Sequence, residues 1–136
     1  MLKKTITYTD YNGVEHTEDF YFNLTKAELA DMQMSENEGF DQKLKNIIEA
    51  KDNKSIYEIF KQFVHKSYGE KSLDGKRFMK VDPVTGAPLY IAFTETEAYS
   101  VLLLELVQSD ESMAAFINGI MPKDISEQLA KQGVTH

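Results

Sequence analysis

The sequence predicts an α+β protein, mostly α, in which an N-terminal β-hairpin is followed by about five helices packed as a small bundle. β-Branched and aromatic residues over Thr5–Thr9 precede an Asn12-Gly13 turn signal, which is typical of a hairpin. Farther on, apolar residues recur at helical spacing between polar, Gly-rich and Pro-rich breaks. At 136 residues the chain can bury a core without disulfides, so we expect one domain over residues 1–136.

The hairpin is expected over residues 1–23. Its return strand, Val14 to Phe22, alternates so that one face carries Val14, His16, Glu18, Phe20 and Phe22. Only the second half of this face is apolar enough to be well buried. Because an isolated two-stranded hairpin is marginal in water, it must pack on helices or join another sheet.

A helical region is expected over residues 24–68. Thr25 and Glu28 form a capping box, and Leu24 with Leu29 forms a hydrophobic staple. This first helix is expected to end near Met34.

Two further helices are predicted in the same region. Apolar residues at helical spacing indicate one from Phe40 to about Lys51. Asp52 or Ser55 caps the next, which Gly69 closes as a C-terminal glycine. Its apolar stripe consists of Ile56, Ile59, Phe60, Phe63 and Val64.

Residues 69–93 are predicted to form a long irregular loop, because glycines and prolines recur among charged residues. A short strand around Arg77 to Val81 is one option within it. Leu89 to Phe93 suits either a helix start or a strand. A loop of this length is a candidate contact surface.

The most apolar part of the chain lies in a second helical region, residues 94–131. Thr94 and Glu97 predict a cap for a helix reaching Val107, and Asp110 predicts the cap of another reaching Gly119. The first helix is apolar around most of its circumference, so it must be covered on several sides. Residues 132–136 are expected to fray.

The cover can come from the rest of the chain or from another protein. Burial statistics favour a core role for these apolar side chains, but their breadth leaves room for a groove that accepts an amphipathic helix. The predicted partner-binding residues are Leu103, Leu106, Met113, Phe116, Ile117 and Ile120.

Composition argues against several other classes of function. A formal net charge of -7 argues against nucleic-acid binding, which depends on clustered Lys and Arg. The one local basic cluster, Lys71, Lys76, Arg77 and Lys80 around Phe78, is better explained as a solvated loop or a protein contact. The longest apolar run is too short to span a membrane, and no secretion signal is present at the N-terminus, so we expect a soluble, cytoplasmic protein.

We expect no catalytic, cofactor-binding or metal-binding residue. The three histidines lack the spacing of metal ligands, and there is no cysteine. The acidic pairs Glu95 with Glu97 and Asp110 with Glu111 lie at predicted helix starts, where carboxylates stabilise exposed N–H groups. No phosphate-binding glycine loop occurs.

Several phrases of the chain, in this order, resemble the tail assembly chaperones of long-tailed phages and prophages of Gram-positive bacteria. They are Thr5–Asp10 with Asn12-Gly13, Glu18–Leu29, Tyr68–Ser72 with Asp74–Phe78, Glu97–Tyr99 and Phe116–Pro122.

The resemblance implies a non-enzymatic protein that binds the phage tape measure protein and keeps it soluble while the tail tube polymerises. It implies a place in the host bacterial cytoplasm and absence from the mature virion. The tail tube protein is a second partner that it allows, and homo-oligomer formation is left open. No cofactor is expected, and neither nucleic acid nor a membrane is expected as a partner.

Two other classes of function compete with this one. The chain could be a structural component of the virion, such as a head-tail connector or tail subunit, whose hairpin extends a neighbour's sheet. A small hydrolase or nuclease would need a converging acid, base and cation, for which the sequence gives no candidate.

Overall fold

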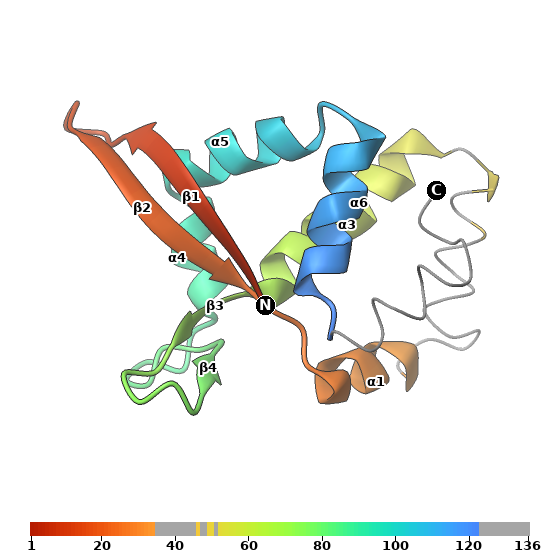
Figure 1. Cartoon of the computed structure of the whole chain (residues 1–136), viewed down its shortest axis with the longest axis horizontal. Helices are drawn as coiled ribbons and strands as arrows, with labels where there is room; N and C mark the ends of the chain where they lie inside the picture. The colour runs from red at the N-terminus through yellow and green to blue at the C-terminus, as the bar shows by residue number, and fades with distance from the viewer. Residues whose placement is uncertain (35–45, 47–48, 51, 123–136) are drawn as a thin grey trace.

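The computed structural model describes residues 1–34, 46, 49–50 and 52–122, and within them the chain combines a four-stranded antiparallel sheet with helices (Figure 1). The elements are β1 (Leu2–Thr9), β2 (Glu15–Phe22), α1 (Lys26–Met34), α3 (Asn53–Ser67), β3 (Tyr68–Lys71), β4 (Phe78–Met79), α4 (Leu89–Thr94), α5 (Glu97–Leu106) and α6 (Asp110–Ile120). The predicted α+β class and N-terminal hairpin are confirmed. The sheet is larger than predicted, so helices dominate less than "mostly α" implies.

The N-terminal hairpin has a continuous register from Leu2 opposite Phe22 to Thr9 opposite Glu15. Its turn is built by Asp10, whose side chain accepts hydrogen bonds from the amides of Asn12 and Val14, both at 2.9 Å. Gly13 adopts a φ of 82°, as the Asn-Gly signal predicts. Only the second half of β2 becomes well covered, also as predicted.

Residues 69–93 contain more regular structure than the irregular loop predicted from their glycines and prolines. The two options within that loop are both present, the short strand around Arg77 to Val81 as β4 and the helix start at Leu89 as α4. β3 pairs with the last two residues of β2, and β4 pairs with β3 in a second hairpin. An isolated bridge between Val81 and Pro88 follows, and then α4. Gly75 and Gly86 each have a φ of 75° at tight turns, so they mark reversals between ordered segments.

Gly69 does not cap a helix, which corrects a second prediction. α3 ends at Ser67, and Gly69 lies within β3 opposite Tyr21. A Cβ at this position would lie 2.6 Å from the carbonyl oxygen of Met79 and 2.7 Å from Cε2 of Phe78. Glycine is therefore required by the close approach of β4.

The capping box at the start of α1 is confirmed. The Glu28 amide donates to Thr25 Oγ1 at 3.1 Å, and the Thr25 amide donates to Glu28 Oε1 at 2.9 Å. Asp52 is the N-cap of α3 and accepts from the Ser55 amide. The Thr25 cap was predicted, and Asp52 was one of two residues predicted for the second cap, because caps depend on neighbouring residues alone.

Two other predicted caps are wrong by one or two positions. Thr94 ends α4 and donates through Oγ1 to the Ile91 carbonyl, so α5 is capped by Thr96 instead. Ser109 caps α6 in place of Asp110, which occupies the first turn. In each case a second residue of capping type stands beside the predicted one, and tertiary packing selects between them.

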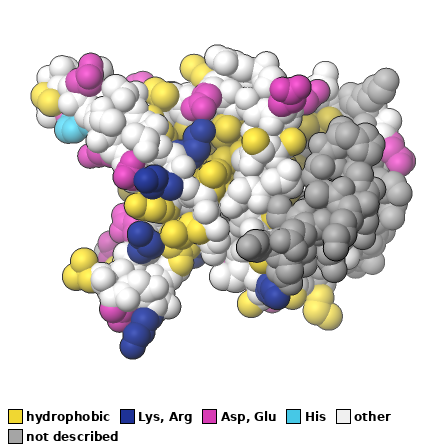
Figure 2. Space-filling view, in the orientation of Figure 1, with side chains coloured by type: hydrophobic (Ala, Val, Ile, Leu, Met, Phe, Trp, Pro, Cys, Tyr) yellow, Lys and Arg dark blue, Asp and Glu magenta, His cyan; other side chains and the backbone are white. Residues whose placement is uncertain are grey.

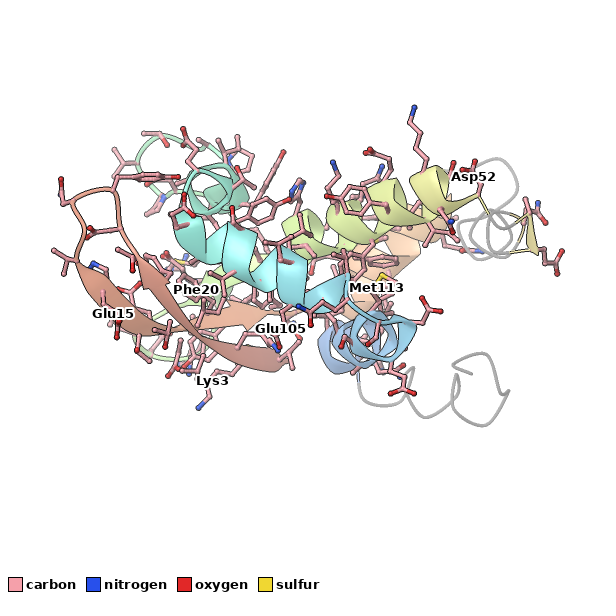
Figure 3. All side chains as sticks on the ribbon, turned by 90° about the horizontal axis from the view of Figure 1, so that it is seen from above. Lys3, Glu15, Phe20, Asp52, Glu105 and Met113 are labelled. Atoms are coloured by element: carbon pink, nitrogen blue, oxygen red, sulfur yellow. The ribbon has the colours of Figure 1, made fainter. Side chains whose placement is uncertain are left out.

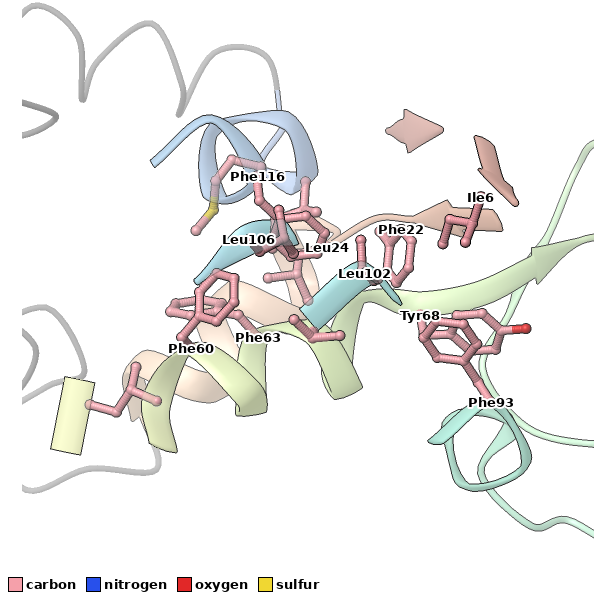
Figure 4. Packing of buried hydrophobic residues seen from close by; sticks show 14 of the residues in the cluster. Ile6, Phe22, Leu24, Phe60, Phe63, Tyr68, Phe93, Leu102, Leu106 and Phe116 are labelled. Atoms are coloured by element: carbon pink, nitrogen blue, oxygen red, sulfur yellow. The ribbon is translucent and has the colours of Figure 1, made fainter. Parts of the chain in front are cut away.

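An aromatic cluster joins the sheet to the helices (Figure 4). The Phe22 ring lies edge-on to Phe116 of α6 at 5.3 Å, and Phe60 of α3 lies 5.8 Å from Phe116. Phe93 of α4 stacks on Tyr68 of β3 with ring centroids 4.3 Å apart. The cluster therefore holds three helices and two strands from distant parts of the chain in one core.

The predicted helix from Phe40 to Lys51 and the tail beyond Pro122 fall outside the described residues, apart from Asn46, Glu49 and Ala50.

We predict that Gly69→Ala destabilises the protein by about 1–3 kcal/mol, because the new methyl group meets backbone that cannot move freely. The matched control is Gly119→Ala, whose nearest neighbour is the flexible Leu2 side chain at 3.0 Å. That variant should stay within about 1 kcal/mol of the wild type. Chemical unfolding measures both, and equal losses would contradict the role assigned to Gly69.

Candidate protein-binding surface

An exposed row of apolar side chains runs along α5. Val101 is 40% exposed, Leu104 65% and Val107 36%. These residues are spaced by three, so they form one ridge of the kind that packs against a neighbouring helix. We call Val101, Leu104 and Val107 the α5 ridge.

The other side of α5 is covered by the chain itself. Ala98, Leu102 and Leu106 are buried in the core. Tyr99 donates or accepts a hydrogen bond with His65 Nε2 at 3.0 Å, which ties α5 to α3. Figure 3 shows α5 between the strands and α3, with Glu105 on the side toward the strands. The apolar circumference noted in the sequence is therefore only partly covered by the described residues.

Negative charge borders the α5 ridge. No Lys or Arg occurs in the sequence between Lys80 and Lys123, whereas Glu97, Glu105, Asp110 and Glu111 lie in α5 and α6. Glu105 is bound by Lys4 of β1 at 3.0 Å. Figure 2 shows acidic side chains along the upper border of the molecule, over α5 and the start of α6, beside hydrophobic ones.

The six predicted partner-binding residues divide into two groups. Leu106, Phe116 and Ile120 are at most 3% exposed and belong to the core, so they offer no surface to a partner in this structure. Leu103, Met113 and Ile117 are partly buried against that core. Partner binding by these three stays a prediction.

Helical periodicity identified the apolar positions but could not tell which side the chain itself covers. Phe116 is covered because Phe22 and Phe60 reach it from two other elements. The sequence-based set omitted all three residues of the α5 ridge. The sequence indicated these three residues only indirectly, because α5 has more apolar residues than a single buried stripe can accommodate.

A hollow of about 310 Å³ lies between α1, α3 and the segment after β4, and Lys80 is one of its lining residues. The Lys80 ammonium donates to the carbonyls of Asn23 and Lys66 at 2.9 and 2.6 Å, and to Glu28 Oε2 at 2.7 Å. These bonds use all three of its donors. Lys80 therefore joins three segments and is not available as a ligand for an anion.

The remaining members of the predicted basic cluster are also separated. Lys71 Nζ lies over the Tyr21 ring at 4.6 Å, while Lys76 and Arg77 lie exposed in the β3–β4 turn. Phe78, the aromatic residue between them, is half-buried against β3. The cluster thus forms no single basic face with an exposed aromatic platform.

His65 of α3 lies beside the core. Its ring stacks on Tyr90 at 4.8 Å, and burial, together with the charge of Lys61, lowers the pKa of His65 below its usual value. Burial raises the pKa of Tyr99 beside it, and burial raises the pKa of Tyr68 to about 12. Both tyrosines are therefore neutral at physiological pH, Tyr99 as a hydrogen-bonding partner of His65 and Tyr68 as a packing group against Phe93.

Within the described part of the chain, no group of three or more His, Asp or Glu side chains is arranged to hold a metal ion. None of the helices that can be described there is long and apolar enough to cross a bilayer.

The fold and its surface define a small α+β protein whose most evident exposed feature is an apolar helix ridge bordered by acid, a surface suited to protein contact. A model of the phage tail assembly chaperone family matches residues 1–135, and the chain belongs to this family. The resemblance stated from the sequence is thereby confirmed.

Comparisons of the chain with curated proteins and with solved structures give no significant match.

We predict that His65 makes the protein sensitive to mild acid. In the unfolded chain this histidine titrates near 6.5, whereas the folded state lowers its pKa. As the pH falls through about 6.5, the unfolded chain therefore binds the proton more readily, and stability is lost. In His65→Gln the midpoint of thermal unfolding should fall less between pH about 7 and about 5. Parallel curves for the two proteins would contradict this account.

Proposed function

We propose that the chain is a tail assembly chaperone that binds the phage tape measure protein and keeps it soluble while the tail tube assembles. It acts by binding and not by catalysis, in the host bacterial cytoplasm, and it leaves before the virion is complete. Family membership supports the general role. The observation that carries the proposed binding step is the exposed α5 ridge.

The α5 ridge suits a helix as its partner. Residues spaced by three on one helix fit the grooves between side-chain rows of another. Covering the exposed fractions of Val101, Leu104 and Val107 contributes roughly 3 kcal/mol of apolar transfer free energy before the cost of association. Such a contact is weak enough to be displaced by polymerising tube protein and becomes effective when many copies line one long helix.

The charges around the ridge favour a particular kind of helix. Because α5 and α6 carry carboxylates without a Lys or Arg, a partner with Lys or Arg beside its apolar stripe gains electrostatic attraction. An acidic partner is repelled. The chaperone therefore selects basic amphipathic segments of the tape measure protein.

We predict that Leu104→Asp reduces the soluble yield of co-expressed tape measure protein several-fold, because it places a charge at the most exposed ridge position. The matched control is Leu73→Asp, the same substitution at a fully exposed residue of the β3–β4 turn. It should leave the soluble yield unchanged. The soluble fraction of the tape measure protein is measured after confirming that both variants unfold at the wild-type temperature.

An equal soluble yield with Leu104→Asp and with the wild type would contradict the use of the ridge. If the wild type itself did not solubilise the tape measure protein, the proposed chaperone function would be contradicted.

A second candidate is a structural part of the virion, such as a head-tail connector or tail subunit. It is favoured by the open outer edge of β1, which could extend a neighbour's sheet. Mass spectrometry of purified particles distinguishes the two functions. Stoichiometric presence of the chain supports the structural role, and its absence supports the chaperone.

A further inference from the structure

β1 is an edge strand whose outer side meets no other strand among the described residues. It spans eight residues and pairs with β2 without interruption, whereas the opposite edge strand, β4, has two. Long and regular edges are the sites where chains add strands from another molecule.

The hydrogen bonds of the sheet show which groups of β1 face outward. The Asp10 amide donates to the Val14 carbonyl at 2.8 Å, so the even-numbered residues of β1 face β2 in the antiparallel alternation. The Asn23 amide donates to the Ser67 carbonyl, so the odd-numbered residues of β2 face the β3 side and its even-numbered residues face β1. Lys3, Thr5, Thr7 and Thr9 therefore turn their N–H and C=O groups to the open edge.

The usual protections of an edge strand are absent from the second half of β1. Thr5 to Thr9 contains no charge and no proline, and the continuous register leaves no bulge. Lys3 and Lys4 are confined to the start of the strand. β1 therefore presents a free pairing surface.

We propose that the outer edge of β1 pairs antiparallel with the same edge of a second copy of this chain. The charges of the strand are self-complementary, because Lys3 and Lys4 open β1 and Asp10 follows it. Antiparallel pairing sets the basic start of each strand against the acidic end of the other. The two sheets become one continuous sheet with two-fold symmetry.

α5 supports the same pairing from beneath the sheet. Glu105 of α5 forms an ion pair with Lys4 of β1. The two charges neutralise each other, so this side of α5 adds no net charge to the proposed dimer interface. Val101 lies one turn before Glu105 and therefore on the same side of α5. Leu104 and Val107 lie farther around the helix, so the dimer leaves most of the α5 ridge open to another protein.

The test compares Thr7→Pro with Thr17→Pro. The two threonines are cross-strand neighbours whose hydroxyls lie 2.9 Å apart, and their amides face opposite edges of the hairpin. Proline removes one outward N–H in each variant and leaves the β1–β2 ladder intact. Light scattering after gel filtration should give a dimer for the wild type and Thr17→Pro, and a monomer for Thr7→Pro.

A wild type that stays monomeric at every concentration overturns the proposal, as does dissociation of both variants alike. If the chain is a monomer whose β1 edge pairs only with a strand of another protein, the wild type stays monomeric here and the proposal is likewise overturned.

Spin labels provide a test that does not depend on how well proline is tolerated. The chain has no cysteine, so Thr7→Cys and Thr17→Cys each give a single labelling site on the exposed face of the hairpin. Because Thr17 lies one strand farther from the two-fold axis in each copy, its label separation should exceed that of Thr7 by about 10 Å. Dipolar distances in the reverse order, or no dipolar coupling at either site, overturn β1 pairing.

Discussion

The contact between α5 and the inner face of the N-terminal hairpin is the interaction on which the rest of the structure depends. An isolated hairpin is marginally stable, and a helix as apolar as α5 needs other elements to cover it. Ile6 and Phe22 of the hairpin share one core with Ala98, Leu102 and Leu106 of α5, so each element removes the apolar surface of the other from water. The outer side of α5 is left uncovered, and this produces the α5 ridge.

The remaining elements are arranged around that contact. α4 reaches β3 through the stack of Phe93 on Tyr68, which holds the second hairpin against the end of β2. α3 and α6 close the core through Phe60 and Phe116. None of them covers the β1 edge or the Leu104 side of α5 in the described part of the chain, so the surfaces proposed for partners are those that the packing leaves open.

Features that depend on adjacent residues could be predicted from the sequence. The Asn12-Gly13 turn and the Thr25–Glu28 capping box belong to this group, because their chemistry is complete within a few residues. The extent of the sheet could not be predicted, because β3 is too short to stand out and gains its stability from Tyr21 and Phe22 far away in sequence. Gly69 was predicted to end a helix for a similar reason. The residues that require a glycine at this position, Phe78 and Met79 of β4, are not its neighbours in sequence.

The candidate site was predicted in part. The sequence pointed to residues 94–121, the region that carries the α5 ridge, and to the excess of apolar residues in its first helix. Two of the predicted partner-binding residues of α6, Phe116 and Ile120, are core residues instead, and Phe22 of β2 and Phe60 of α3 lie against the Phe116 ring. When a helix is apolar around most of its circumference, tertiary packing decides which side is covered, and periodicity carries no information about that side.

We propose that the α5 ridge is the side of this chaperone that meets the tape measure protein. Because the chain has no cysteine, Leu104→Cys carries an environment-sensitive fluorophore at one defined position. On addition of tape measure protein, we expect a blue-shifted, brighter emission at position 104 and no change in the matched Leu73→Cys protein. A response at position 73 with none at 104 would contradict it.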